Sequence, residues 1–505
     1  MITNTGVDVA RNVGWRLSQG LFTNITAIWI FFLAAHLLPT IGDIGVYYAL
    51  NVVATLFYVM MGLALPKANM KFIARYVGLN KKQDAIATAR LTLKVGFILS
   101  FMGVAILGLF SNMISILLNI SADKWLLDIM IPYVFLLVLQ PFAESAISGF
   151  QRFDIVFKIQ TAQSSVIGIV GGILLLTGYG IVGIIIAWTA GYLIGTLANL
   201  LVFYRRFNRA LGTSSLKSLV SFSVPLYGME VSSYLVQNTD KFLVLLLTGT
   251  AVLGIYSPAV TVATFVSIVG TSMNLVLLPK LSEVEGRYGE SGLERAARES
   301  SRWVFLVMTP MSMGLAAVSV PVARLFGDRF IPSAPLVVII SLAMAFTAGY
   351  VVINATLIAI GKTSIFFVSA LVGVITDIGI TLFLIMPYGA VGVAIGRASL
   401  QVCIFLLPLL YMVLKTNQAL DYRAMFATLG SSIIMSVPIV YIQQFSTEIF
   451  ILPLLVLIGI TIYLVLIKLL RIVDNNDVEI FRELLPKRLG FALSIVNWLA
   501  HESRD

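Results

Sequence analysis

The stretch at 159–204, IQTAQSSVIGIVGGILLLTGYGIVGIIIAWTAGYLIGTLANLLVFY, decides the fold class. It holds two apolar runs, at 159–178 and 181–204, which are joined only by Tyr179 and Gly180. An α-helix needs about 20 predominantly apolar residues to cross the hydrocarbon core of a bilayer. Each run is long enough, so the stretch predicts two membrane-spanning helices that form a tight helical hairpin.

The same pattern extends over most of the chain. With Gly, Pro, Asn and charged clusters taken as breaks, the 505 residues contain fourteen such stretches. They lie at 14–37, 44–65, 91–118, 128–148, 159–178, 181–204, 218–248, 251–275, 303–324, 335–360, 365–386, 389–414, 424–444 and 449–470. Alternation with a period of two, which an outer-membrane barrel needs, does not occur. We therefore expect an all-α polytopic membrane protein with fourteen transmembrane helices.

Composition excludes several classes of protein. Only 11% of the residues are charged and 59% are hydrophobic, whereas a soluble domain carries about 25% charged residues. This excludes a soluble enzyme, a disordered chain and a nucleic-acid-binding domain. One Cys and two His give no basis for a disulfide framework or a metal site. No phosphate-binding Gly-rich motif or catalytic constellation occurs, so we expect no enzyme activity, no catalytic residues and no cofactor.

The distribution of Lys and Arg predicts the orientation. If the N-terminus is cytoplasmic, 29 of the 34 Lys and Arg residues fall on the cytoplasmic side and three on the other side. The remaining two, Lys241 and Arg397, lie inside spans. Cytoplasmic loops carry an excess of positive charge, so both termini are predicted to be cytoplasmic in a multi-pass protein of the cell (cytoplasmic) membrane. This asymmetry also accounts for most of the net charge of +10.

The chain repeats itself in four short matches. They occur in the same order, with offsets of 209 to 213 residues, and at corresponding places in the order of spans. The matches are Gly45-Val46-Tyr47 with Gly254-Ile255-Tyr256, Leu65-Pro66-Lys67 with Leu278-Pro279-Lys280, Arg75-Tyr76 with Arg287-Tyr288, and Tyr179-Gly180-Ile181-Val182-Gly183 with Tyr388-Gly389-Ala390-Val391-Gly392. Such ordered self-similarity indicates an internal duplication.

The duplication predicts the domain organisation. Each copy holds six spans, an even number, so the two copies are parallel repeats related by an axis along the membrane normal, with substrate bound between them. We expect a six-helix lobe at 1–210, a second at 211–418, two further transmembrane helices at 419–470 and a cytoplasmic amphipathic tail at 471–505. A channel is the alternative, but two unequal halves in one chain favour alternating access.

Ionisable side chains inside spans are expensive and usually face a protein interior or a water-filled cavity. Asp240 and Lys241 lie in the polar run Gln237-Asn238-Thr239-Asp240-Lys241. They are candidates for the lining of a substrate cavity, with a local ion pair near the outer surface as the alternative. Arg16, at the cytoplasmic mouth of the first span, is a further cavity candidate.

Arg397 is the last of the cavity candidates. A guanidinium suits bidentate contact with phosphate, and the alternative is a structural pair with Asp377 on the preceding span. Glu230 and Asp377 lie in the middle of spans, where a carboxylate can exchange a proton or bind Na⁺. Both are candidates for ion coupling, and a structural hydrogen bond is the alternative. Glu144 lies near the cytoplasmic end of its span, where a hydrated carboxylate is favoured over a functional site.

Three ordered motifs resemble a known family over residues 8–470. They are Pro225…Asp240-Lys241-Phe242…Gly254-Ile255-Tyr256, then Leu325-Phe326-Gly327-Asp328-Arg329-Phe330, then Tyr388-Gly389-Ala390-Val391-Gly392. Together with the predicted six, six and two spans, they resemble the polysaccharide (O-antigen-type) flippases of the multidrug/oligosaccharidyl-lipid/polysaccharide exporter superfamily. The resemblance implies two six-helix lobes around a cationic central cavity, and it carries Asp240 and Lys241 over by motif.

The resemblance also implies a function. These flippases move a polyprenyl-linked oligosaccharide from the cytoplasmic to the outer leaflet during synthesis of surface polysaccharides or glycoconjugates. The expected partners are therefore that glycolipid, the lipid bilayer and a coupling ion, H⁺ or Na⁺, with no nucleic acid. The alternative function is a cation-coupled multidrug antiporter, which generally has twelve spans. A scaffold subunit without transport is a third possibility, which buried charges in duplicated halves disfavour.

Overall fold

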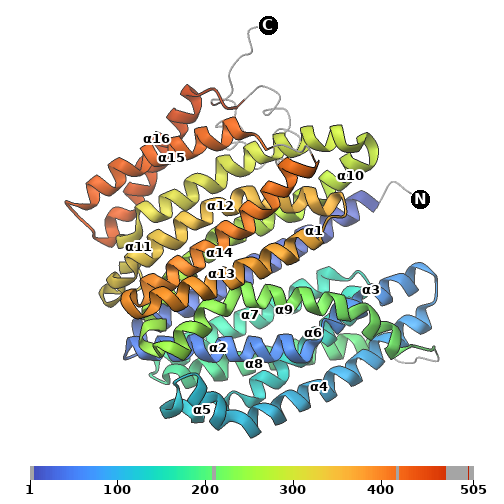
Figure 1. Cartoon of the computed structure of the whole chain (residues 1–505). Helices are drawn as coiled ribbons and strands as arrows, with labels where there is room; N and C mark the ends of the chain where they lie inside the picture. Colours follow the sequence, from blue (N-terminus) through green and yellow to red (C-terminus); the bar gives the residue numbers. More distant parts are fainter. Residues whose placement is uncertain (1–4, 207–211, 417–419, 474–498, 500–505) are drawn as a thin grey trace. The chain divides into compact units, whose positions relative to one another are not determined.

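A computed structural model describes residues 5–206, 212–416, 420–473 and 499, and all regular structure in these ranges is helical (Figure 1). The chain divides into two compact units. Unit 1 comprises Met1–Ser257 with Asp377–Val393, and unit 2 comprises Pro258–Thr376 with Ala394–Asp505. The all-helical fold class predicted from the sequence is confirmed for these ranges. The predicted tail at 471–505 lies outside the described residues except at 471–473 and 499.

Unit 1 is built from the first nine helices and the start of the tenth. These helices are α1 (Thr5–Leu37), α2 (Ile41–Gly62), α3 (Leu65–Gly78), α4 (Lys82–Leu117), α5 (Lys124–Ile129), α6 (Ile131–Gly149), α7 (Phe153–Leu176), α8 (Gly180–Arg206), α9 (Leu216–Leu247) and α10 (Thr250–Ala317). Local signals set some of their ends: Thr40 and Asp43 form a reciprocal capping box at the start of α2. Such caps satisfy the otherwise unpaired N–H groups at a helix start.

Small residues allow α7 and α8 to pack closely. Gly183, Ala187, Gly191 and Gly195 recur every four residues along one face of α8. A Cβ atom at Gly191 would lie 2.4 Å from Cγ1 of Ile167 on α7. Membrane helices associate through small residues of this kind because lipid gives no hydrophobic drive between them. These small residues hold α7 and α8 close together, and both helices contribute to the polar cavity that is described below.

A reciprocal contact joins α2 and the start of α10 inside unit 1. A Cβ atom at Gly45 would lie 1.8 Å from the carbonyl oxygen of Thr250, and one at Gly254 would lie 2.1 Å from the carbonyl oxygen of Ile41. No side chain fits at either position, so both glycines are required by backbone packing. They are the paired glycines of the first repeat match, separated by 209 residues.

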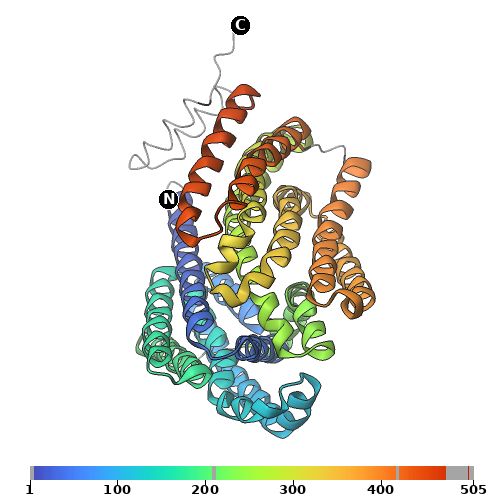
Figure 2. The ribbon, with the colours of Figure 1, turned by 90° about the vertical axis from the view of Figure 1, so that its left-hand side faces the viewer.

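Unit 2 contains most of α10 and the helices that follow it. These are α11 (Ser319–Arg324), α12 (Ala334–Ala359), α13 (Ser364–Tyr388), α14 (Ala390–Tyr411), α15 (Tyr422–Gln443) and α16 (Leu452–Leu469), of which α13 and α14 also contribute to unit 1. α15 and α16, coloured towards red in Figure 2, pack against each other. Arg302 of α10 forms a salt bridge of 3.0 Å with Asp421, which also caps the start of α15.

Within the described ranges, thirteen helices are long and apolar enough to cross a membrane, whereas the sequence predicts fourteen spans. The difference lies in α10, one element of 68 residues that covers the predicted span 251–275 and most of the predicted span 303–324. The end of the second span is α11. A straight helix of the length of α10 would extend roughly 100 Å. The backbone of Gly289 is not helical, with φ 67° and ψ −160°, so α10 is two helices joined at a kink.

Candidate functional site

The structure places Asp240 in the core of unit 1. Its side chain on α9 is fully buried, and its Oδ2 accepts a hydrogen bond of 2.6 Å from the hydroxyl of Tyr256 on α10. Its Oδ1 accepts a second bond of 2.9 Å from the backbone N–H of Lys241. The acidic residue and the tyrosine of the first family-like motif are therefore direct partners. In this conformation Asp240 ties α9 to α10, and its role in a substrate cavity stays a prediction.

Lys241 directs its ammonium group along its own helix. Its Nζ donates to the carbonyl oxygen of Gln237 and to Oδ1 of Asn238, both at 2.9 Å. The side chain is half-buried. The polar run quoted above is thus a local hydrogen-bonded cluster on the last turns of α9, and Lys241 remains a candidate for the cavity.

Glu230 on α9 has a partner that the sequence did not predict. Lys67 at the start of α3 places its Nζ 3.0 Å from Oε1 of Glu230, and the two side chains are 59% and 15% exposed, respectively. The helices α3 and α9 pack against each other, which brings the pair together. The two residues lie 163 positions apart in the sequence, so no pattern within one span predicts the pair.

The remaining three predicted residues of the site are Asp377, Arg397 and Arg16. Asp377 on α13 is fully buried and accepts a hydrogen bond of 3.1 Å from Thr381 one turn later. Arg397 on α14 is half-buried. The two belong to different units, so their pairing stays a prediction. Arg16 lies on α1, but its side chain is outside the part of the structure that is described.

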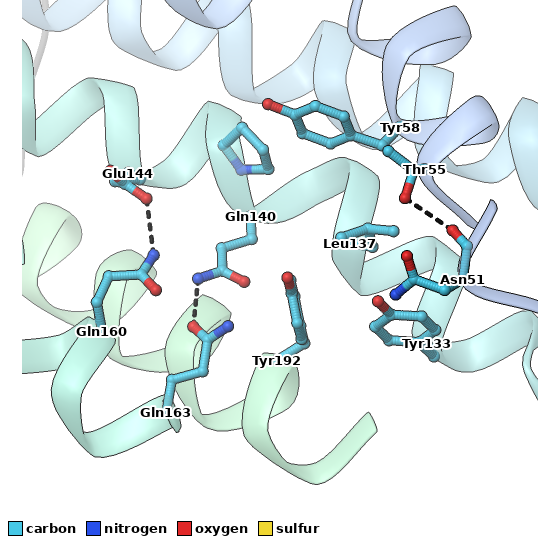
Figure 3. A pocket seen from close by; sticks show the side chains of 11 residues that line it. Asn51, Thr55, Tyr58, Tyr133, Leu137, Gln140, Glu144, Gln160, Gln163 and Tyr192 are labelled. Carbon is cyan, nitrogen blue, oxygen red and sulfur yellow. Dashed lines mark hydrogen bonds between the residues drawn. The ribbon is translucent and has the colours of Figure 1, made fainter. Parts of the chain in front are cut away.

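Unit 1 contains a polar cavity of about 350 Å³ among α2, α6, α7 and α8 (Figure 3). Most of its lining side chains carry a hydroxyl, amide or carboxylate group. The lining residues are Asn51, Thr55, Tyr58, Tyr133, Leu137, Gln140, Pro141, Glu144, Gln160, Gln163 and Tyr192. We call this cavity the amide–tyrosine pocket. Glu144, which the sequence analysis considered, is one of these lining residues.

Two hydrogen-bonded pairs order the amides of the pocket. Nε2 of Gln140 donates to Oε1 of Gln163, and Nε2 of Gln160 donates to Oε2 of Glu144 at 2.8 Å (Figure 3). Each pair joins α6 to α7. Gly195 on α8 makes room for the first pair, because a Cβ atom there would lie 2.2 Å from Oε1 of Gln163.

Aromatic rings form the other wall of the pocket. Tyr133 is stacked on Trp188 with ring centroids 5.1 Å apart, and it meets Tyr192 edge-on at 5.3 Å. Tyr47 completes the cluster at 5.5 Å from Trp188. Such offset and edge-to-face arrangements are the favoured geometries of aromatic pairs. The tyrosines therefore stand in fixed orientations at the edge of the cavity.

The sequence held a signal for this pocket that a search for ionisable residues overlooks. Its lining residues share one helix face on each element: Asn51, Thr55 and Tyr58 follow helical spacing on α2, as do Gln140 and Glu144 on α6. Residues three, four and seven positions apart lie on one side of a helix. Uncharged amides in apolar spans, read with this spacing, would have indicated the pocket.

Unit 2 contains a cavity of different character. It measures about 460 Å³, lies among α10, α15 and α16, and is lined mainly by Leu, Val, Ile, Met and Pro side chains. The hydroxyl of Tyr463 in its wall donates to the carbonyl oxygen of Leu306 at 2.9 Å. Among the described residues, no group of three or more His, Cys, Asp or Glu could hold a metal ion.

Comparison with protein families gives one match over half of the chain. The model of a family described as polysaccharide biosynthesis protein matches residues 79–335. No curated protein matches this sequence. The matched range runs from the connection after α3 to the start of α12 and includes most of the amide–tyrosine pocket.

Several solved structures share the fold. The lipid II flippase MurJ in an inward closed conformation has a TM-score of 0.72 and 17% identity, covering 93% of this chain and 99% of its own. An inward-facing multidrug resistance transporter of the MATE family, within the MOP superfamily, has a TM-score of 0.66 and 14% identity, with 79% and 94% covered. VcmN, a MATE transporter of Vibrio cholerae, in its bent form has a TM-score of 0.55 and 15% identity, with 85% and 99% covered.

Proposed function

This chain belongs to the polysaccharide biosynthesis protein family, and from that premise we propose that it is a flippase for a polyprenyl-linked oligosaccharide. It moves the glycolipid from the cytoplasmic to the outer leaflet of the cell membrane by alternating access, coupled to H⁺ or Na⁺. The observation that carries the proposal is the family match over 79–335, found on a chain with the fold of MOP-superfamily transporters.

Two cavities support this substrate class. A glycolipid has a polar, hydroxyl-rich head and a long apolar chain. Unit 1 offers a polar pocket lined by amides and tyrosines, and unit 2 offers a cavity with almost entirely apolar walls. Polar groups at membrane depth are expensive unless they serve a protein-lined cavity, so the polar pocket calls for a function.

Four residues remain our candidates for the central cavity: Arg16, Asp240, Lys241 and Arg397. The cations among them suit the phosphate that links sugar to polyprenol, because a guanidinium or ammonium forms strong charge-assisted hydrogen bonds with phosphate oxygens. Glu230 and Asp377 remain the candidates for ion coupling. In the structure the ammonium group of Lys67 forms a salt bridge with Glu230. A coupling ion that binds to Glu230 would therefore compete with Lys67 for the carboxylate.

A multidrug antiporter is the second candidate. The likeness to a MATE-family multidrug resistance transporter favours it, but that likeness rests on 14% identity and concerns the fold. Family membership favours the glycolipid.

The test is the sidedness of lipid-linked oligosaccharide in the native host deleted for this gene. We expect intact glycolipid to accumulate on the inner leaflet, wild type to restore export, and Arg397→Ala and Lys241→Ala to fail. Lys362→Ala, at an exposed position between α12 and α13, is the matched control and should restore export. An unchanged glycolipid distribution together with increased drug sensitivity would replace the flippase with the antiporter.

A further inference from the structure

We propose that a surface groove of unit 1 binds one anionic phospholipid of the inner leaflet. The groove measures about 450 Å³ and is lined by residues of α4, α6 and α8. It shares no lining residue with the amide–tyrosine pocket, and we call it the α4–α8 groove. This inference goes beyond the proposed function, because it concerns a lipid that stays with the protein and not the substrate that is transported.

The groove lies where two helices approach a third, since α4 and α8 both pack on α6. A Cβ atom at Gly96 of α4 would lie 2.4 Å from Cγ of Phe142 on α6. One at Gly195 of α8 would lie 3.0 Å from Nε2 of Gln140 on α6. These glycines bring both helices close to α6. Leu139 of α6, which is only 6% exposed, is left at the floor of the space between them.

Hydrocarbon forms the walls of the groove. The apolar lining residues are Leu93, Phe97, Ile98, Leu139 and Leu200. Phe97 meets Phe135 of α6 edge-on at 5.5 Å, which fixes one wall. All three helices are long and apolar enough to cross a membrane, so we expect lipid to cover this surface. A hollow that no chain fills would forfeit the dispersion contacts of its walls, so an acyl chain is the expected occupant.

A cation and a hydroxyl group lie at one end of the groove. Lys94 is three residues inside the predicted span 91–118, and Tyr204 is the last residue of the predicted span 181–204. Both residues line the groove and are exposed. These two span ends are cytoplasmic in the predicted orientation. With a rise of about 1.5 Å per residue, Lys94 lies roughly 5 Å inside the hydrocarbon core, from where its long side chain reaches the headgroups.

The charge of Lys94 selects the headgroup. Within the described part of the chain, its ammonium group forms no salt bridge or hydrogen bond with the protein. An ionisable side chain in a span usually has a partner, and a lipid phosphate would supply one through a charge-assisted hydrogen bond. Arg205 and Arg206, exposed in the last turn of α8, add positive potential beside Tyr204. Basic pockets of this kind between membrane helices favour an anionic headgroup over a zwitterionic one.

A second groove of unit 1 shows what this charge adds. It measures about 480 Å³, lies between α1 and α7, and is also mostly apolar. Its described lining residues include no Lys, Arg, Asp or Glu. Acyl chains would fill both grooves, but only the α4–α8 groove has a charged group that distinguishes one headgroup from another. The two grooves therefore form a matched pair for experiments.

Lipid binding is measured by native mass spectrometry of the purified full chain. The probes are dioleoyl phosphatidylglycerol, which is anionic, and dioleoyl phosphatidylcholine, which is zwitterionic. We expect wild type to bind one phosphatidylglycerol roughly tenfold more tightly than phosphatidylcholine, because hydrogen bonds to charged groups have this strength. Lys94→Gln should bind both lipids equally weakly, and Lys94→Arg should keep the preference. Lys81→Gln, at an exposed position outside the groove, is the control and should keep it too.

Filling the groove tests where the acyl chain binds. Leu200→Trp places a bulky side chain in the α4–α8 groove and should weaken phosphatidylglycerol binding roughly tenfold through lost contacts with the chain. Ile169→Trp, a similar change in the groove between α1 and α7, should leave this binding unchanged. Phosphatidylglycerol should also raise the melting temperature of wild type and Ile169→Trp more than that of Leu200→Trp, because a ligand of the folded state stabilises it.

Equal binding of the two lipids by wild type, or an undiminished preference for phosphatidylglycerol in Lys94→Gln, would overturn the proposal. A competition experiment tests the other occupant with this chemistry, which is the polyprenyl phosphate end of a glycolipid. Undecaprenyl phosphate at equal concentration should leave phosphatidylglycerol bound to wild type. Displacement of phosphatidylglycerol from wild type but not from Lys94→Gln would assign the groove to the glycolipid, and the phospholipid assignment would be wrong.

Discussion

Asp240 and Tyr256 show how one hydrogen bond explains a motif. Both side chains are fully buried, and the phenol donates to the carboxylate at 2.6 Å. A hydrogen bond to a charged group contributes about 1.5–3 kcal/mol, more than a bond between neutral groups. The motif therefore keeps an acid and a tyrosine sixteen residues apart because they meet between α9 and the start of α10.

We expect Tyr256→Phe to lower the free energy of unfolding by about 1.5–3 kcal/mol, because a buried carboxylate loses a donor. Thermal unfolding of the protein in detergent measures the change. Tyr288→Phe is the matched control, since Tyr288 is 67% exposed. If both variants melt at the wild-type temperature, the hydrogen bond does not hold α9 to α10.

The salt bridge between Lys67 and Glu230 allows a test of whether Glu230 binds the coupling ion. Because the ammonium lies 3.0 Å from the carboxylate, Lys67→Glu should reduce transport through repulsion. The charge exchange Lys67→Glu with Glu230→Lys restores the attraction and should recover most of the transport rate. The measurement is glycolipid translocation in proteoliposomes across a Na⁺ or H⁺ gradient.

The outcome of the exchange distinguishes two roles for Glu230. Recovery indicates that the pair acts as a link between α3 and α9. Failure of the exchange, together with loss of gradient dependence in Glu230→Gln, indicates that the carboxylate itself binds the coupling ion. The surface pair Glu283 and Arg287, exchanged in the same way, is the control and should change nothing.

At this scale the sequence predicted charged residues better than uncharged ones. Asp240 and Glu230 attract attention because a charge in an apolar span is expensive. Gln140, Gln160 and Gln163 carry no charge, and single amides are common in helices, so only their meeting in space marks them. The pairing of Lys67 with Glu230 also escapes prediction, because only the folded structure brings these two distant residues together.

At the scale of elements, α2 and the start of α10 make the same contact in both directions. Gly45 of α2 meets Thr250, and Gly254 of α10 meets Ile41. The repeat offset of 209 residues relates Gly45 to Gly254 and Ile41 to Thr250. When residue i of one copy meets residue j of the other and the reverse also holds, the contact is what a two-fold axis produces. This reciprocity supports the predicted parallel duplication.

We therefore expect Gly45→Ala and Gly254→Ala to be similarly harmful. An added methyl group would collide with a backbone carbonyl at 1.8 Å and 2.1 Å, respectively, and a backbone cannot swing aside as a side chain can. Both variants should express poorly or melt well below wild type in a fluorescence size-exclusion assay.

Gly430→Ala supplies the control for these two variants. Nothing lies within 4 Å of the position that its Cβ would occupy on α15, and Ala favours a helix over Gly by about 1 kcal/mol. We expect it to be neutral or stabilising. A mild effect of Gly45→Ala with a severe effect of Gly254→Ala would argue against a symmetric contact.

Element boundaries were predicted well where Gly and Pro break the apolar runs and poorly where charged residues continue a helix. The hairpin at Tyr179 and Gly180 is found between α7 and α8, close to its predicted place. No helix is predicted for the polar segment between the spans that end at 275 and begin at 303, yet it is helical on both sides of Gly289. Glu, Arg and Ala are good helix formers in water, so polarity alone does not end a helix.

For the whole molecule, the two compact units and the two predicted lobes divide the chain differently. The lobe boundaries at 210 and 418 follow the sequence repeat and stay predictions. The units follow contact density, and unit 1 includes α9 because α9 packs against α2 and α3. A repeat records how a gene was duplicated, whereas a compact unit records how helices pack, and the two need not coincide.

The orientation of the molecule depends on whether α10 crosses the membrane once or twice. Counted as two crossings, seven spans separate Lys124 at the start of α5 from Lys362 after α12, which places these residues on opposite sides. Counted as one, six spans separate them and they share a side. The excess of Lys and Arg predicts opposite sides, with Lys124 outside and Lys362 in the cytoplasm.

Cysteine labelling decides between these counts, because the chain has a single Cys, at 403. In a Cys403→Ser background, a membrane-impermeant maleimide applied to intact cells should label Lys124→Cys but neither Lys362→Cys nor Tyr288→Cys beside the kink of α10. Permeabilised cells should show labelling of all three. Labelling of Lys362→Cys from outside together with Lys124→Cys would mean that α10 crosses once, and the predicted fourteen spans and cytoplasmic C-terminus would both be wrong.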